Sequence, residues 1–176
     1  MGFFKNIFSR TDAKSNIIVA YNVILAASRN VEFYGETKYP DSYDGRLDCL
    51  TAHMAVVMAA AQADNSDGKQ VSQALFDAMV DDFDVSLREE GLTDAGVKRR
   101  MKKMIGYFYK RLRDFTEALE RSENLNQALM EGALDADASG FSESFAVYLK
   151  SSFERLSTLS LDDIRAGKFG FEAQNI

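Results

Sequence analysis

The sequence has very little of the chemistry that holds small or metal-built proteins together. Its 176 residues include one cysteine, one histidine, one proline and no tryptophan. A single cysteine excludes a disulfide framework within the chain and favours a reducing compartment, and a single histidine excludes metal cages built from several. One proline and 11 glycines leave few helix breakers, which favours long helices over short strands joined by turns. We therefore predict an all-α fold.

What the sequence does contain is enough apolar material for a core. The composition is 46% apolar and 27% charged, as in ordinary soluble domains. A chain of this length removes about 70% of its unfolded surface from water on folding, so a core alone can stabilise it. Because repeats and low-complexity segments are missing, we expect residues 13–176 to form a single globular helical bundle, preceded by an amphipathic segment at residues 1–12.

Hydrophobic periodicity places the helices of that bundle. Residues 49–63 carry no charged side chain, so this stretch is predicted to be a helix buried at the centre, too short to span a bilayer. Ser15 and Thr93 are predicted helix caps, and Gly91 is a predicted helix end. Further helices are expected at residues 15–29, 69–90, 93–121 and 142–156, with a loose tail from residue 167.

The first residues form a short apolar segment. Four large apolar side chains stand there at helical spacing, beside basic residues: Phe3, Phe4, Ile7 and Phe8. Such a segment suits contact with a membrane surface. It suits packing on its own domain equally well, since one or two helical turns are marginal alone. The sequence leaves both interpretations open.

Charge is distributed in two opposite blocks. The net charge is −6, which argues against nonspecific binding of DNA by the chain as a whole. Residues 64–94 hold nine acidic and two basic side chains, a local balance of −7. Residues 98–113 hold eight basic side chains and no acidic one, a local balance of +8. This asymmetry is the first indication of a partner.

The acidic block forms a stripe on the helix expected at residues 69–90. At 100° per residue, its members fall within about 80° of the helix circumference. They are Gln73, Asp77, Asp81, Asp84 and Arg88. The main apolar stripe flanks it on one side, and a weaker strip flanks it on the other: Val71, Ala74, Ala78 and Val85. We therefore expect the acidic stripe to be half-buried, where its carboxylates need partners.

Asp84 can pair with Arg88 at i+4 within that helix, which leaves Asp77 and Asp81 to bind another element or another protein. The predicted partner-binding site consists of Asp77, Asp81, Asp84, Arg88 and Glu89. A stripe that is structural or simply solvated is the alternative.

The basic block lies opposite the core face of the helix expected at residues 93–121. Its predicted outer face consists of Arg99, Lys102, Lys103, Lys110 and Arg113. This face has three interpretations: it lies against anionic lipid, it meets an acidic partner such as ribosomal RNA, or it is a solvated outer face.

No catalytic motif is present. Cys49 and His53 share a helix face and could be drawn as a dyad or half of a zinc site. In so apolar a helix we expect an inert cysteine and a core histidine that donates to a carbonyl or carboxylate. Residues 77–84 resemble the magnesium motif of prenyltransferases, which leaves a metal-dependent enzyme as an alternative. We predict no catalytic residue, no metal and no cofactor.

Several segments resemble, in order and spacing, the ubiquinol-cytochrome c chaperone family. The most specific are Leu75-Phe76-Asp77-Ala78-Met79 and Ser86-Leu87-Arg88-Glu89. The others include Asp44-Gly45-Arg46-Leu47-Asp48, Ala52-His53-Met54, Asp94-Ala95-Gly96-Val97 and Phe108-Tyr109-Lys110-Arg111. The resemblance covers residues 43–121 of the chain.

This resemblance implies a function. Members of the family assist the assembly of respiratory complex III by holding newly made cytochrome b. It therefore implies a non-enzymatic bacterial assembly chaperone, cytoplasmic and peripheral at the cytoplasmic face of the inner membrane, with cytochrome b as its partner. Two alternatives remain: a helical adaptor that binds anionic membrane or the ribosome through its basic helix, and the metal-dependent enzyme on residues 77–84.

Overall fold

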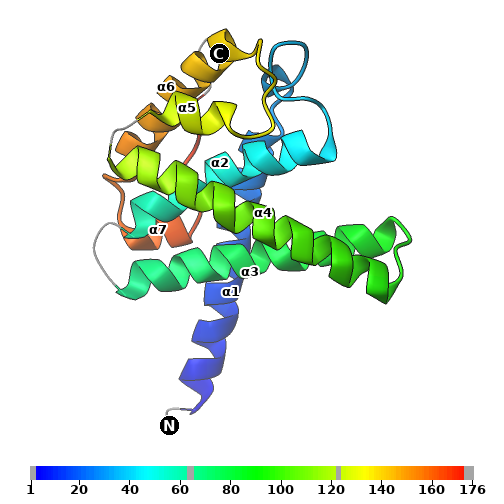
Figure 1. Ribbon diagram of the computed structural model, residues 1–176. Coiled ribbons are helices and arrows are strands. Elements are labelled where there is room, and N and C mark those ends of the chain that lie inside the picture. The colour runs from blue at the N-terminus through cyan, green and yellow to red at the C-terminus, as the bar shows by residue number, and fades with distance from the viewer. Residues whose placement is uncertain (1–2, 63–65, 122–123, 173–176) are drawn as a thin grey trace.

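The computed structural model describes residues 3–62, 66–121 and 124–172, with side chains for residues 16–61 and for both later ranges. Over these residues the chain forms α-helices and one short 3-10 helix, with no strand (Figure 1). The helices are α1 (Phe3–Ser28), η1 (Val31–Phe33), α2 (Tyr43–Gln62), α3 (Ser66–Glu89), α4 (Asp94–Glu120), α5 (Leu125–Met130), α6 (Ser139–Leu156) and α7 (Leu161–Arg165). The predicted all-α class is confirmed.

Helix α2 is the centre of the bundle. Every residue from Leu47 to Ala61 is buried, and α1, α3, α4 and α6 all pack against the helix. A helix surrounded on all sides needs apolar side chains on all sides, which is the pattern of residues 49–63. The prediction of a buried central helix is confirmed for the described residues.

Helices α3 and α4 form a hairpin whose turn follows the predicted signals. Gly91 has a φ of +83°, a left-handed conformation that glycine adopts without steric cost. Thr93 caps α4, because its hydroxyl accepts a hydrogen bond from the Gly96 amide. A second, small core joins the two helices here: Leu47, Leu87, Val97, Met101 and Met104. Figure 1 shows this end of the hairpin extending from the rest of the bundle as an arm.

Helix α1 differs from its prediction. It runs unbroken from Phe3 to Ser28, so the predicted helix start at Ser15 is wrong. Since no glycine or proline occurs between these residues, nothing in the backbone stops the helix from extending. In Figure 1 its first turns extend past α3. The side chains predicted to contact a membrane lie outside the described residues: Phe3, Phe4, Ile7 and Phe8.

For residues 167–172, the prediction of a loose tail is also wrong. Phe169 and Phe171 pack on the main core, and the Phe171 ring lies 4.9 Å from the His53 ring, centroid to centroid. Gly167, with a φ of +68°, allows this course, because a Cβ there would come within 2.9 Å of the Ala20 amide nitrogen. The tail is ordered by burying two aromatic rings.

Candidate functional site

A groove of about 970 Å³ lies between α1 and α3, and α7 reaches it at one end. Apolar side chains make up most of its lining: Ile17, Ile18, Tyr21, Val71, Ala74, Ala78, Val80 and Val85. Two of them are unusually open to solvent, because Ile18 is 43% exposed and Val85 is 52% exposed. The groove is therefore apolar surface that the fold itself does not cover.

Carboxylates rim this groove. Asp77, Asp81 and Asp82 all line it. Asp77 accepts a hydrogen bond of 2.8 Å from the Gln73 amide, and Asp82 accepts one of 2.9 Å from the Tyr21 hydroxyl. Burial and the neighbouring Asp82 raise the pKa of Tyr21, so the phenol stays a donor. Asp81 has no hydrogen bond or ion pair with any residue that the structure describes.

The prediction that the acidic stripe is half-buried is wrong for Asp77 and Asp81, which are exposed. The cause is the course of α1, which packs on α3. Val71 is buried, and Ala74 and Ala78 are partly buried, so the weaker apolar strip receives the packing. The two carboxylates are left at the edge, where they open into the groove.

The other members of the predicted partner site lie apart from the groove. Arg88 binds Asp84 at 2.6 Å and also Asp94 at 2.6 Å. Since Asp94 begins α4, this double ion pair ties the two helices of the arm together. Glu89 is exposed beside it. The five predicted residues therefore divide into a groove pair, Asp77 and Asp81, and an arm cluster with a structural role.

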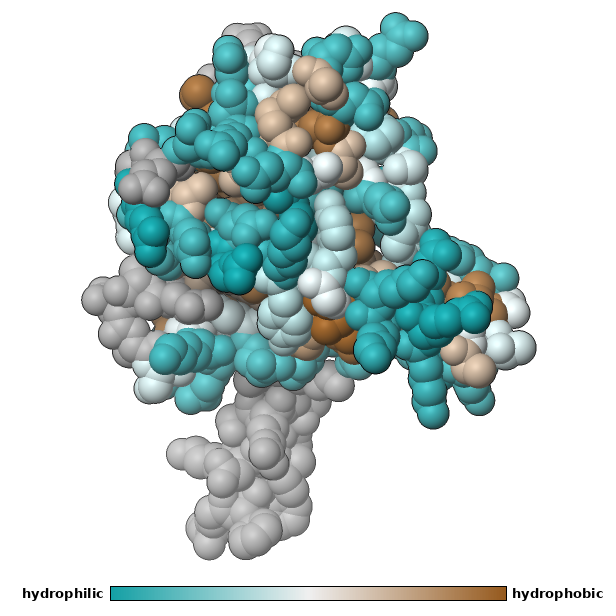
Figure 2. Space-filling model, in the orientation of Figure 1, coloured by the Kyte–Doolittle hydropathy of each residue, from teal (hydrophilic) through white to brown (hydrophobic). Residues whose placement is uncertain are grey.

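The basic band of α4 (Arg99, Lys102, Lys103, Lys110 and Arg113) is exposed along its whole length. At 100° per residue, its members lie within about 100° of the helix circumference. Arg113 contacts Asp114 at 3.3 Å; the other four have no ion pair within the described part of the chain. Figure 2 shows hydrophilic side chains over most of the arm on the side that faces the viewer, with hydrophobic residues at its outer end.

Gly106 lies at the middle of the basic band, and a Cβ there would meet no atom within 4 Å. A glycine inside a helix costs about 0.5–1 kcal/mol relative to alanine. We expect Gly106→Ala to raise the free energy of unfolding by about this amount, measured by urea denaturation. Gly45→Ala is the control and should lower it, because its Cβ would collide with the Pro40 carbonyl oxygen. A loss of stability in Gly106→Ala would contradict the open geometry.

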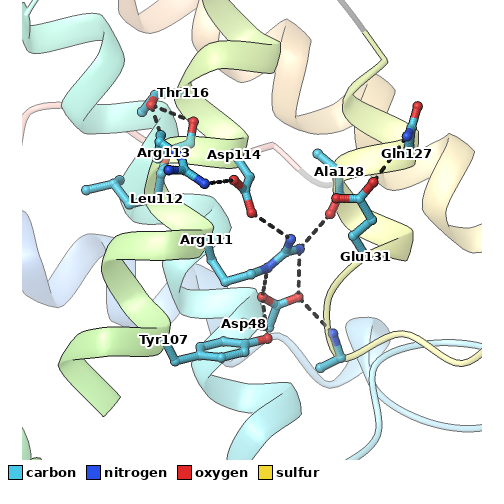
Figure 3. A network of polar contacts seen from close by, with 11 residues as sticks. Asp48, Tyr107, Arg111, Leu112, Arg113, Asp114, Thr116, Gln127, Ala128 and Glu131 are labelled. Atoms are coloured by element: carbon cyan, nitrogen blue, oxygen red, sulfur yellow. Dashed lines mark hydrogen bonds and ion pairs between the residues drawn. The ribbon is translucent and has the colours of Figure 1, made fainter. Parts of the chain in front are cut away.

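A buried ion pair, absent from the predicted sites, joins α2 to α4. The Arg111 Nε lies 2.7 Å from the Asp48 carboxylate, and both side chains are at most 1% exposed. Figure 3 shows Asp48 between Arg111 and Tyr107, whose hydroxyl lies 2.9 Å from the carboxylate. The Ala133 amide also donates to Asp48, at 3.2 Å. Arg111 also donates to the Ala128 carbonyl at 2.7 Å. The network therefore connects α2, α4, α5 and the turn after α5.

The Asp48–Arg111 ion pair is closely packed by its neighbours. The Arg111 guanidinium lies 4.3 Å from the Phe115 ring centroid and 3.7 Å from the Asp114 carboxylate. A Cβ at Gly132 would collide with both Asp48 and Arg111. Burial lowers the pKa of Arg111, but the hydrogen bond and the charge of Asp48, together with the nearby Tyr107 and Tyr39, outweigh this and the net shift is upward. The ion pair is buried and does not line the α1–α3 groove.

Sequence periodicity could have found the buried arginine. The core residues of α4 include Val97, Met101, Met104, Phe108 and Phe115. Their spacing alternates between four and three residues, and position 111 continues it. Charge alone places Arg111 in the basic block, whereas its spacing places it on the core face.

Cys49 and His53 form no reactive dyad. The His53 Nδ1 donates to the Cys49 carbonyl at 2.8 Å, so Nε2 accepts from the Tyr148 hydroxyl at 2.9 Å. Burial lowers the pKa of His53 to about 4 and raises the pKa of the Cys49 thiol well above its ordinary value. Both residues are fully buried. The expectation of a core histidine bonded to a carbonyl is confirmed.

The described residues show no metal-binding arrangement. No group of three or more His, Cys, Asp or Glu side chains in them is placed to hold an ion. Asp84 of the 77–84 segment is held by Arg88, away from Asp77 and Asp81. Among the helices that the structure describes, none combines the length and hydropathy needed to cross a bilayer.

Over the described residues the fold is all-α, and its α1–α3 groove is lined mostly by apolar side chains. Residues 36–172 match the model of the ubiquinol-cytochrome C chaperone family, and the chain belongs to this family. The predicted resemblance is therefore confirmed, and the match extends beyond residues 43–121. Membership supports a chaperone role, which implies a client protein and argues against an enzyme.

One solved structure gives the same result at the level of the fold. The chain is similar to the crystal structure of the Cbp3 homolog from Brucella abortus, with a TM-score of 0.76 and 27% sequence identity. The alignment covers 96% of each chain. The comparison with curated proteins gave no match.

Proposed function

We propose that this chain is a non-enzymatic assembly chaperone for respiratory complex III, which holds newly made cytochrome b in the α1–α3 groove at the cytoplasmic face of the inner membrane. The observation that carries this proposal is the groove itself, with its apolar floor and its carboxylate rim. Family membership supports a chaperone role. The groove supports a client that is apolar and carries positive charge beside its apolar segment.

The apolar floor suits a segment of a membrane protein. A newly made membrane helix is apolar on most faces and needs to be kept from water until it is placed. Ile18 and Val85 offer exposed aliphatic surface on the two sides of the groove. An apolar helix lying in such a groove is a common mode of recognition, and release requires only a competing partner, without a chemical step.

The carboxylates at the edge of the groove suit the basic residues that flank a membrane helix. The cytoplasmic loops of membrane proteins carry an excess of Lys and Arg close to the helix ends. Asp77 and Asp81 are exposed and have no basic partner among the described residues, so they are free to pair with these positive flanks. Charge and hydropathy thus favour the same client, an apolar helix with a basic end.

The test removes the two rim charges. In a strain that makes cytochrome b, we expect Asp77→Asn with Asp81→Asn to lower the yield of a cross-link from the groove to cytochrome b about five- to tenfold. Each exposed ion pair contributes up to about 1 kcal/mol, and the two effects add. Since both side chains are exposed, the free energy of unfolding should stay within about 0.5 kcal/mol of the parent value.

Glu117→Gln with Glu120→Gln is the matched control. It also removes two exposed carboxylates, but from α4, outside the groove lining. Its cross-link should be recovered at the parent yield. A large stability loss in the aspartate variant with cross-linking retained would assign the stripe to the fold and refute the role of the rim.

A further inference from the structure

We propose that the basic band of α4 is a docking surface for an anionic lipid bilayer. This proposal goes beyond the chaperone function and does not rest on the groove, because it concerns other side chains on another helix. It assigns a role to a surface that neither the core nor the arm cluster uses.

The charges of the band are available to an external partner. Arg99, Lys102, Lys103 and Lys110 are exposed and have no ion pair within the described residues. Outside the band, Lys98 is exposed as well, whereas the two other arginines of α4 already have contacts. Arg100 lies 4.5 Å from the Tyr43 ring centroid, and Arg111 is buried with Asp48. Arg100 and Arg111 are therefore engaged within the fold, whereas these four basic side chains of the band face solvent.

The shape of the band suits a flat surface. Its residues follow one side of α4 from Arg99 to Arg113, a length of about 20 Å at 1.5 Å per residue. Gly106 stands between Lys103 and Lys110 with open space where a side chain would be, so the helix backbone can approach a surface closely there. The arm carries the first part of the band away from the rest of the bundle (Figure 1).

The side chains of the band favour lipid over RNA. Proteins recognise RNA by stacking bases on free aromatic faces and by hydrogen bonds from amides and hydroxyls. Residues 98–113 contain no Asn, Gln, Ser, Thr or His, and the exposed ring of Tyr109 already packs on Phe76, 5.0 Å between centroids. What remains is a row of point charges. An anionic headgroup layer needs no more than that, because it attracts each Lys or Arg independently.

Docking through α4 leaves the groove accessible. In Figure 1, α4 crosses the front of the bundle, whereas α1 passes behind α3. The groove is lined by residues of α1, α3 and α7 and by none of α4. A chain lying on the membrane by its basic band can still receive a client in the groove.

The test is flotation of the full-length protein with lipid vesicles. We expect it to float with vesicles of phosphatidylglycerol and phosphatidylcholine at low salt, but not with phosphatidylcholine alone, and to be released by high salt. Each base near an anionic surface strengthens binding about fivefold, so Lys102→Gln, Lys103→Gln and Lys110→Gln together should weaken partitioning about 100-fold. Equal loss in the control, Lys69→Gln with Lys150→Gln and Lys168→Gln, would overturn the proposal.

Two further outcomes would overturn it and name another partner. Retained flotation in the triple α4 variant, together with its loss in Phe4→Ser with Phe8→Ser, would assign membrane contact to the start of α1. Binding to a ribosomal RNA transcript without flotation on the anionic vesicles would assign the band to RNA. The cytochrome b cross-link reads out the groove separately, so failure of one proposal leaves the other intact.

Discussion

Replacing Arg111 with methionine is expected to lower the free energy of unfolding by about 3–5 kcal/mol, a large part of the stability of a domain of this size. The Asp48 carboxylate is fully buried and accepts two hydrogen bonds from the guanidinium, at 2.7 Å and 3.4 Å. Methionine fills much of the space but leaves this carboxylate without a counter-ion. The Ala128 carbonyl loses its donor as well.

Urea denaturation of the purified variant measures this loss. Arg113→Met is the matched control, since it removes an arginine two positions along the same helix whose side chain is 66% exposed. Its free energy of unfolding should change by less than about 0.5 kcal/mol. A comparably small effect of Arg111→Met would mean that the ion pair contributes no more than a surface contact.

A double variant distinguishes the contribution of the Asp48–Arg111 ion pair from the cost of leaving one of its two charges buried and unpaired. Asp48→Leu alone leaves the guanidinium uncompensated and removes the acceptor of the Tyr107 hydroxyl and the Ala133 amide. In Asp48→Leu with Arg111→Met no buried charge is left unpaired. The double variant should therefore lose less free energy of unfolding than the sum of the two single variants.

Lowering the pH from 6.5 to about 4 is expected to remove about 3 kcal/mol of stability through His53 alone. Burial lowers the pKa of this imidazole from 6.5 to about 4, so the folded state favours the neutral ring. Between these two values the unfolded chain binds a proton that the folded chain does not. The His53 contribution is thus complete above pH 6.5, decreases as the pH falls, and changes no further below about 4.

Two measurements check the pH dependence of stability that is assigned to His53. Because the chain has one histidine, a single imidazole signal in the proton NMR spectrum reports its titration, and it should keep its neutral position down to about pH 5. Urea denaturation from pH 7.5 to 4.5 should show a steeper loss of stability in the parent protein than in His53→Gln. Carboxylate titration is common to both, so the difference isolates the histidine. An imidazole midpoint near 6.5 would contradict the effect.

Local sequence signals predicted the elements that local forces decide. Gly91 and Thr93 end α3 and begin α4 where expected, because a left-handed glycine and a capping hydroxyl act within one helical turn. The uncharged stretch of residues 49–63 predicted a helix packed on every side. Ser15 was misleading, because a serine caps a helix only where the preceding residues are not helical.

The candidate site was predicted only in part. Asp77 and Asp81 were identified as carboxylates in need of partners, and the structure places them on the groove. Their exposure could not be predicted, because it depends on where α1 crosses α3. Arg111 shows the converse case: its spacing places it on the core face of α4, but its pairing with Asp48 depends on how α2 packs against α4.

By itself, the sequence determined the helical class, the buried central helix, the caps of the α3–α4 hairpin, the opposite charge blocks and the family resemblance. All of these depend on composition or on residues close together along the chain. The tertiary structure alone decided the groove, the Asp48–Arg111 pair, the neutral His53 and the docking of Phe171. These depend on contacts between residues distant in sequence, which no local pattern specifies.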